Sequence, residues 1–168
     1  LEAYYRLMLQ DILPEEIERI IYLDIDIIVN NISDLCRTEL SDKYIAAVDD
    51  MTLSMSKFAD FVDLSNLHYF NSGVMLLNLK KMREDKVYQK LIEYRTNGRN
   101  HFVDQDAFNV VMQNSRIQLP YEFNFNLMEI EEFDFDELCS RYAKKQYPSL
   151  EMLLQNQVIL HYAGKYKP

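Results

Sequence analysis

Two carboxylates, Asp24 and Asp26, are the residues best placed to do chemistry in this sequence, because they follow the apolar run 20–23 directly. In an extended chain, residues two apart point to the same face, so both carboxylates lie side by side at the end of a predicted buried strand. Their like charges repel, and a hard divalent cation relieves that repulsion. The spacing therefore indicates a metal site, although a solvated turn that holds two aspartates explains the same pattern.

A second group of residues lies near the C-terminal end, where His161 ends another apolar run and Gly164 and Lys167 follow. A histidine in such a run is often a core residue satisfied by its neighbours. Here, however, an imidazole can join carboxylates on a transition-series ion, and backbone at a glycine can approach a phosphate closely. An ammonium group can also neutralise that phosphate. The segment therefore suits a metal-bound diphosphate.

Two further polar clusters interrupt apolar sequence at 71–73 (NSG) and 104–106 (DQD). The first is either a turn into a strand or a set of amide and backbone groups that faces a hydroxylated ligand such as a sugar. The second opens a predicted helix, where one aspartate serves as the N-terminal cap. Capping does not explain the glutamine between the two aspartates.

The elements that must position these clusters alternate along the chain. Short apolar runs predict strands at 20–23, 44–48, 73–79, 116–119 and 158–162. Helical spacing of apolar residues predicts helices at 2–13, 80–97, 104–113, 137–145 and 150–155. The segment 121–136 has no readable pattern. Alternating strands and helices predict a layered α/β domain.

Composition excludes several classes of protein. The 18 Lys and Arg against 27 Asp and Glu give a net charge of −9, which disfavours nucleic-acid binding. Only three glycines occur in 168 residues, too few and too scattered for a dinucleotide-binding fingerprint or a P-loop. No apolar run is long enough for a membrane-spanning helix. The two isolated cysteines fit a reducing compartment, so we expect a cytoplasmic protein.

The order of these patterns resembles that of glycosyltransferase family 8, which includes bacterial lipooligosaccharide galactosyltransferases. The resemblance covers nearly the whole chain and rests on segments 5–7 (YRL), 22–26 (YLDID), 70–74 (FNSGV), 104–106 (DQD) and 161–168 (HYAGKYKP). It implies a GT-A fold, with a mixed, mostly parallel sheet flanked by helices. It also implies retaining transfer of glucose or galactose from a UDP-sugar to a saccharide, lipid-linked or protein acceptor, with Mn²⁺ or Mg²⁺ bound.

The resemblance also implies roles for individual residues. The implied metal ligands are Asp24, Asp26 and His161, and the implied diphosphate contacts are Gly164 and Lys167. The implied donor contacts are Arg6, Asp49, Asn71, Ser72, Gly73, Asp104 and Gln105, of which Asp104 and Gln105 are also the implied catalytic residues.

The stereochemical route stays open at this point. Cleavage of a sugar–phosphate bond builds positive charge on the sugar and negative charge on the diphosphate, which a cation and Lys167 would stabilise. Retention by double displacement needs a carboxylate under the anomeric carbon. The resemblance places the amide of Gln105 there, which is a poor nucleophile and favours front-face attack. The neighbouring Asp104 and Asp106 are the carboxylates that leave double displacement open.

The ends of the sequence lead us to expect a single partial domain over residues 1–168. The chain opens on Leu1 without an initiator Met and stops at Pro168 just after a strand-like run. Members of the resembled family carry a further N-terminal strand and helix that hold the nucleotide base and ribose. We therefore expect the metal and sugar half of the site without the uridine pocket. Peripheral attachment to a membrane, through sequence beyond Pro168, stays open.

Two other functions compete with glycosyl transfer. A haloacid-dehalogenase-type phosphatase also places a DxD motif after an apolar strand and binds Mg²⁺. Its second aspartate is usually followed by a small or hydroxyl residue, whereas Ile27 and Ile28 follow here, and Asp49-Asp50 comes too early for its later acidic pair. The other alternative is a non-catalytic sugar-nucleotide-binding domain, or a fragment that is inactive by itself.

Overall fold

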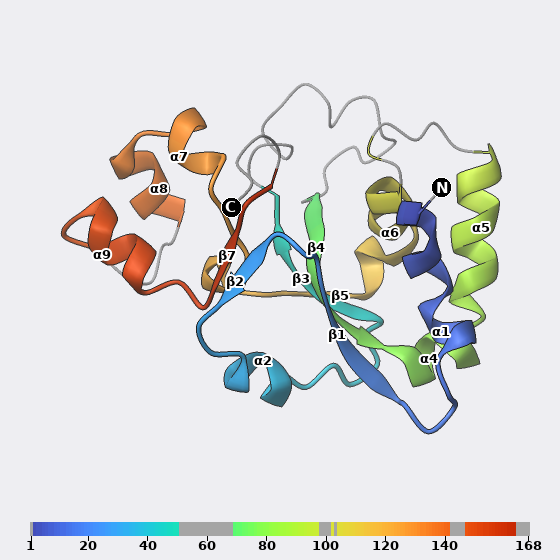
Figure 1. Cartoon of the computed structure of the whole chain (residues 1–168). Helices are drawn as coiled ribbons and strands as arrows, with labels where there is room; N and C mark the ends of the chain where they lie inside the picture. The colour runs from blue at the N-terminus through green and yellow to red at the C-terminus, as the bar shows by residue number, and fades with distance from the viewer. Residues whose placement is uncertain (1, 51–68, 98–101, 103, 142–146, 164–168) are drawn as a thin grey trace.

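Two β-sheets form the centre of the molecule in the computed structural model, which describes residues 2–50, 69–97, 102, 104–141 and 147–163 (Figure 1). The first sheet has the order β1-β4-β3-β5 and comprises β1 (Arg19–Leu23), β3 (Ile45–Asp49), β4 (Phe70–Asn78) and β5 (Arg116–Gln118). The second has the order β2-β7-β6 and comprises β2 (Ile27–Val29), β6 (Phe125–Asn126) and β7 (Ile159–His161).

The directions of the strands differ in part from the expected mostly parallel sheet. Strand β4 runs antiparallel to both β1 and β3, whereas β3 and β5 are parallel. Strand β7 is antiparallel to β2 and parallel to β6. Among the described strands the sheets are thus mixed, with antiparallel pairs in the majority. An apolar run shows that both faces of a strand are covered, but it does not show which way the neighbouring strand runs.

Both faces of the first sheet are buried. On one face, Ile45, Ala47, Met75 and Leu77 pack against the helices that Figure 1 shows at the right. The bounds of this helical layer are η1 (Glu2–Met8), α1 (Leu9–Ile12), α4 (Leu79–Glu84), α5 (Val87–Asn97) and α6 (Asp104–Met112).

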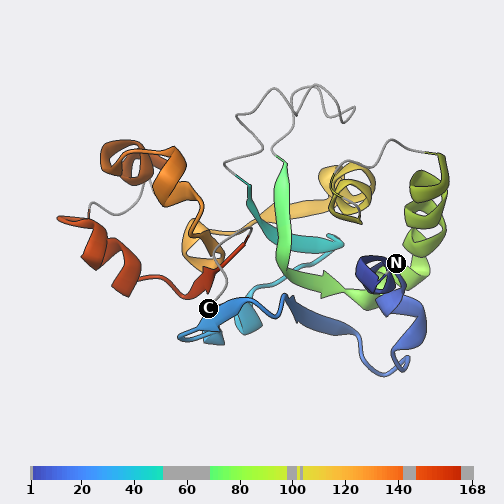
Figure 2. The same ribbon diagram turned by 45° about the horizontal axis from the view of Figure 1, so that its top comes forward.

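The opposite face of this sheet packs against α2 (Ser33–Arg37), η4 (Tyr121–Phe123) and the second sheet. A third apolar cluster joins Phe125 to α7 (Glu129–Glu132), α8 (Phe135–Arg141) and α9 (Leu150–Gln155). Figure 2 shows this group of helices on the side of the molecule opposite α4, α5 and α6. A short 3-10 turn, η3 (Gln113–Ser115), leads into β5.

Several elements differ from their predicted bounds for local reasons. The expected helix at 80–97 is broken between α4 and α5, where Lys86 has the left-handed φ of 52° that ends a regular helix. The expected helix at 2–13 is mostly a 3-10 helix. The segment 121–136, which has no readable pattern, forms η4, β6, α7 and the start of α8. None of the described helices has both the length and the apolar character that crossing a membrane requires.

Candidate active site

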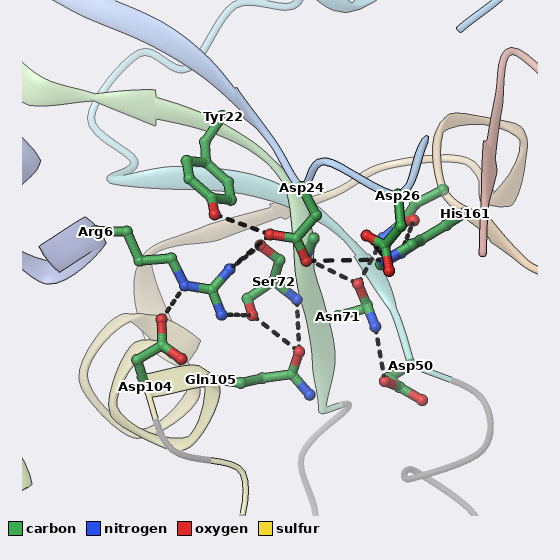
Figure 3. Close-up of polar contacts among 12 residues, drawn as sticks. Arg6, Tyr22, Asp24, Asp26, Asp50, Asn71, Ser72, Asp104, Gln105 and His161 are labelled. Carbon is green, nitrogen blue, oxygen red and sulfur yellow. Dashed lines mark hydrogen bonds and ion pairs between the residues drawn. The ribbon is translucent and has the colours of Figure 1, made fainter. Parts of the chain in front are cut away.

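Two neighbouring aspartates, Asp24 and Asp26, meet the distant His161 between the two sheets (Figure 3). Asp24 follows β1, and its N–H donates to the carbonyl of Gly73 on β4 at 2.8 Å. The carbonyl of Asp26 accepts from the N–H of Tyr162 at 2.8 Å, which joins the start of β2 to the end of β7. The Nε2 atom of His161 lies 3.5 Å from Asp26 Oδ1 and 3.9 Å from Asp24 Oδ2.

The donor set of this cluster fits a divalent cation. One ligand atom from each of the three residues lies within 4.8 Å of the others. Ile25, between the two aspartates, is fully exposed, so both carboxylates turn inward as the spacing of two predicts. Two carboxylates suit a hard ion, and the imidazole adds a ligand that transition-series ions such as Mn²⁺ accept.

Arg6 connects this cluster to α6. Its Nη2 donates to Ser72 Oγ at 2.8 Å and its Nη1 to the Ser72 carbonyl at 3.0 Å, while Nη1 lies 3.4 Å from Asp24 Oδ1. The Nε atom pairs with the Asp104 carboxylate, which is 2% exposed. The guanidinium also lies over the Tyr22 ring, at 5.2 Å from its centroid. This cation therefore neutralises carboxylates on both sides of the site.

Tyr22 supports the same carboxylate from the end of β1. Its hydroxyl donates to Asp24 Oδ1 at 2.8 Å. Burial of the ring is the main cause that raises the pKa of Tyr22, so the phenol keeps its proton as a donor. Asp24 thus has one oxygen held by Tyr22 and Arg6, and its other oxygen faces His161.

In the DQD segment, Gln105 and Asp106 point in different directions from α6 and have different partners. Gln105 Oε1 accepts from the N–H of Ser72 at 2.8 Å and from its hydroxyl at 2.9 Å. Asp106 is fully buried and accepts from Tyr69 Oη at 2.6 Å and from the Phe102 N–H at 2.9 Å. Burial and this hydrogen bond raise the pKa of Tyr69. Asp106 therefore fastens the chain just before α6 to the helix, whereas Gln105 faces the site.

The NSG segment lies inside β4 rather than in a turn before it. Asn71 Nδ2 donates to Asp50 Oδ2 at 3.1 Å, and Asn71 Oδ1 accepts from the Gly73 N–H at 2.9 Å. A Cβ atom at Gly73 would overlap the imidazole of His161. The glycine is therefore needed for the close approach of β7 to β4, and Asn71 presents an amide beside the cluster (Figure 3).

Asp49, one of the predicted donor contacts, has partners within the protein. Its carboxylate pairs with Arg116 Nη1 at 2.6 Å and accepts from Gln118 Nε2 at 2.9 Å. Asp50 is the neighbour that reaches Asn71. Adjacent residues of a strand point to opposite faces, and the register of β3 against β4 shifts between Ala47 and Asp49. The sequence offers two adjacent aspartates, and only the pairing of the strand selects between them.

Ser72, another predicted donor contact, is also engaged within the protein. The residue is 1% exposed, and its hydroxyl and backbone bond to Arg6 and Gln105. It therefore holds these two side chains in place. Asn124, which the sequence analysis did not single out, contacts His161 and Asn71. Gly164 and Lys167 lie outside the described residues.

Comparison with known proteins identifies the family of this chain. The sequence model of glycosyl transferase family 8 matches residues 1–168. The chain belongs to glycosyltransferase family 8. The GT-A fold expected from the sequence is confirmed by a solved galactosyltransferase, LgtC, in complex with donor and acceptor sugar analogues. That structure matches with a TM-score of 0.80 and 25% identity over 99% of this chain and 59% of the other. Family membership decides against the phosphatase interpretation of the DxD motif.

Two relatives of this chain are a lipopolysaccharide glucosyltransferase and a general stress protein. A lipopolysaccharide 1,2-glucosyltransferase of Escherichia coli K12 is 29% identical over 98% of this chain and 48% of its own length. General stress protein A of Bacillus subtilis is 26% identical over 99% of this chain and 58% of its own length. The chain thus spans about half the length of these relatives.

Proposed function

We propose that this chain carries the metal and donor-sugar part of a retaining hexosyltransferase that moves glucose or galactose from a UDP-sugar. The acceptor is a saccharide, a lipid-linked saccharide or a protein, and the saccharide of a lipopolysaccharide is favoured by the Escherichia coli relative. The observation that carries the proposal is the meeting of Asp24, Asp26 and His161 beside Arg6 and Gln105. We further propose a cytoplasmic location.

Each part of the site has a proposed task in this reaction. Asp24, Asp26 and His161 would hold a Mn²⁺ or Mg²⁺ ion, which when bound would supply positive charge for the leaving diphosphate. Gly164 and Lys167 bind that diphosphate as well. Arg6 keeps Asp24 and α6 in one arrangement. The amides and carboxylates next to it bind hydroxyl groups of the donor sugar, and we assign this task to Asn71, Asp50, Asp104 and Gln105.

The hydrogen bonds of α6 favour front-face attack. Both aspartates beside Gln105 are engaged, Asp104 by Arg6 and Asp106 by Tyr69 and the Phe102 N–H. The oxygen of Gln105 accepts two hydrogen bonds from Ser72, which positions the amide and opposes its use as a nucleophile. The acceptor hydroxyl then attacks from the side of the leaving group, and a diphosphate oxygen takes its proton.

A second function is favoured by the length of the chain. Because the chain spans about half of its curated relatives, it can bind a sugar nucleotide and a cation without completing turnover by itself. Hydrolysis or transfer assays separate these functions, because binding without turnover leaves the UDP-sugar intact.

Calorimetric titration of UDP, with and without Mn²⁺, tests the metal site directly. We expect binding only with Mn²⁺, and we expect Asp26→Asn to abolish it without loss of the folded state, because the variant removes one of two charged ligands. Asp34→Asn is the matched control, since Asp34 is exposed on α2 and pairs only with a surface arginine in the described contacts. Mn²⁺-dependent binding of normal strength by Asp26→Asn would contradict the proposal.

A further inference from the structure

Asn124 forms buried hydrogen bonds beside the proposed metal ligands. Asn124 lies between η4 and β6 and is 2% exposed. Its Nδ2 lies 2.9 Å from Asn71 Oδ1, and its Oδ1 lies 3.0 Å from His161 Nδ1. The side chain therefore joins the histidine of the cluster to the asparagine that contacts Asp50.

The direction of these hydrogen bonds follows from one backbone group. The N–H of Gly73 can only donate, so the atom of Asn71 that it meets at 2.9 Å is the amide oxygen. The amino group of Asn71 then faces Asp50, whose carboxylate accepts it. Because Asn71 presents oxygen to Asn124, Asn124 must present its amino group in return. Its own oxygen is thereby turned toward His161.

An amide oxygen beside an imidazole nitrogen selects the tautomer of the ring. The oxygen of Asn124 can only accept a hydrogen bond, here from Nδ1–H, so the neutral ring of His161 carries its hydrogen on Nδ1 and a lone pair on Nε2. Nε2 is the atom that lies 3.5 Å from Asp26 and 3.9 Å from Asp24. We propose that Asn124 is a positioning residue that holds His161 in the Nδ1–H tautomer and so presents Nε2 to the cation.

The position of the ring is determined separately from its proton. The imidazole packs against the backbone of β4 at Gly73, where a Cβ atom would overlap it. Strand β4 thus sets where the ring lies, and Asn124 sets which nitrogen has the hydrogen. The same chain of amides continues through Asn71 to Asp50, so the metal side and the proposed sugar side share one hydrogen-bond network.

The test compares two variants at one position with a matched control. Asn124→Leu removes the acceptor, whereas Asn124→Asp keeps an oxygen for Nδ1–H and preserves the shape of the side chain. Asn126→Ala is the control, because Asn126 is also buried and its oxygen accepts from the Met128 N–H instead. Long-range ¹H–¹⁵N spectra of the metal-free protein, recorded where the ring is neutral, report the tautomer. The chain has three histidines, so His161→Gln assigns the signal.

We expect the Nδ1–H tautomer in the unaltered chain, in Asn124→Asp and in Asn126→Ala. In Asn124→Leu we expect the Nε2–H form and a loss of about 10- to 100-fold in Mn²⁺ affinity, measured by electron paramagnetic resonance. An Nε2–H ring in the unaltered chain, or no change of tautomer in Asn124→Leu, would overturn the inference. The inference rests on the proposed metal site, and the two fail differently. An unaltered chain that binds no Mn²⁺ refutes the proposed function, whereas the tautomer is read without any metal.

Discussion

Asp49 and Asp50 are neighbours of the same residue type, but their carboxylates have different partners. Asp49 forms a buried ion pair with Arg116, whose guanidinium lies over the ring of Phe70 at 5.4 Å from the centroid. Asp50 is equally buried but accepts from the amide of Asn71, next to the metal cluster. The first carboxylate stabilises the junction of β3 and β5, and the second belongs to the proposed donor site.

Substitution of each aspartate by asparagine separates these two roles. Asp49→Asn leaves the charge of Arg116 without its buried partner, so we expect the free energy of unfolding to fall by roughly 3 kcal/mol. Asp50→Asn should change stability by less than about 1 kcal/mol, because it keeps the shape and a hydrogen-bonding oxygen. If the unaltered chain hydrolyses UDP-sugars, Asp50→Asn should instead abolish most of that hydrolysis. Urea denaturation and a hydrolysis assay measure the two effects, and the reverse outcome would restore Asp49 as the donor contact.

At the scale of elements, one side chain holds the segment that carries Arg6. Arg83, in α4, donates to five backbone carbonyls, one in α1 and four in the connection between α1 and β1. The acceptors are the carbonyls of Gln10, Leu13, Pro14, Glu15 and Ile17, at 2.6–3.3 Å. The last carbonyls of a helix lack partners within the helix, so Arg83 supplies donors at the end of α1 and along the chain that follows it.

Removal of the guanidinium should loosen the whole N-terminal segment. We expect Arg83→Met to lower the free energy of unfolding by roughly 3 kcal/mol, since hydrogen bonds from a charged donor are lost together. Hydrogen exchange should become faster in residues 5–17 than in β4. Arg37→Met is the control, because Arg37 is exposed and its ion pair with Asp34 contributes little. Equal stability of the two variants would contradict this role of Arg83.

The junction of β3 and α4 predicts a dependence of stability on pH. Tyr44 donates to Asp85 at 2.6 Å, and this hydrogen bond, with burial second, raises the pKa of Tyr44 to about 12 from 10.0. The native state therefore keeps a proton that the unfolded state loses above pH 10. The contribution is complete below that pH and is lost as the pH rises toward about 12.

Tyr44→Phe should make stability less dependent on pH in this window. We expect the difference in unfolding free energy between the unaltered chain and the variant to shrink as the pH rises from 10 toward about 12. Denaturation at a series of alkaline pH values measures that difference. Tyr5→Phe serves as the control, because Tyr5 is exposed. A constant difference across the window would show that the Tyr44–Asp85 contact carries no such linkage.

At the scale of the whole molecule, the proposed ion joins the two sheets. Asp24 leaves the first sheet after β1, Asp26 enters the second at β2, and His161 ends β7. Because the ligands belong to both sheets, a cation bound to the folded state alone stabilises their assembly. The stabilisation amounts to about 2.7 kcal/mol at a Mn²⁺ concentration 100 times the dissociation constant.

Thermal unfolding with and without Mn²⁺ measures this linkage. We expect Mn²⁺ to raise the melting temperature of the unaltered chain and a chelator to reverse the rise. Asp26→Asn should show no rise, because the site has lost a ligand, while Asp34→Asn should behave like the unaltered chain. A rise of the same size in Asp26→Asn would mean that Mn²⁺ binds elsewhere on this acidic molecule.

The amino-acid sequence by itself determined the order of the motifs, the family and the positions of most strands. These features depend on residues close together in the chain: the apolar run before Asp24, the spacing of two that turns both carboxylates inward, and the helix that begins at Asp104. The spacing of apolar residues along the chain indicates which face of a strand or helix is buried, so these elements could be predicted from the sequence.

Only the tertiary structure decided the direction of the strands, the different partners of Asp49 and Asp50 and the contact of Asn124 with His161. Asn124 and His161 are 37 residues apart and meet because β6 and β7 pair. No pattern along the chain encodes such a meeting, since it depends on the register of strands from different parts of the sequence. The chemistry of the site was therefore readable residue by residue, whereas its hydrogen-bond network required the assembled sheets.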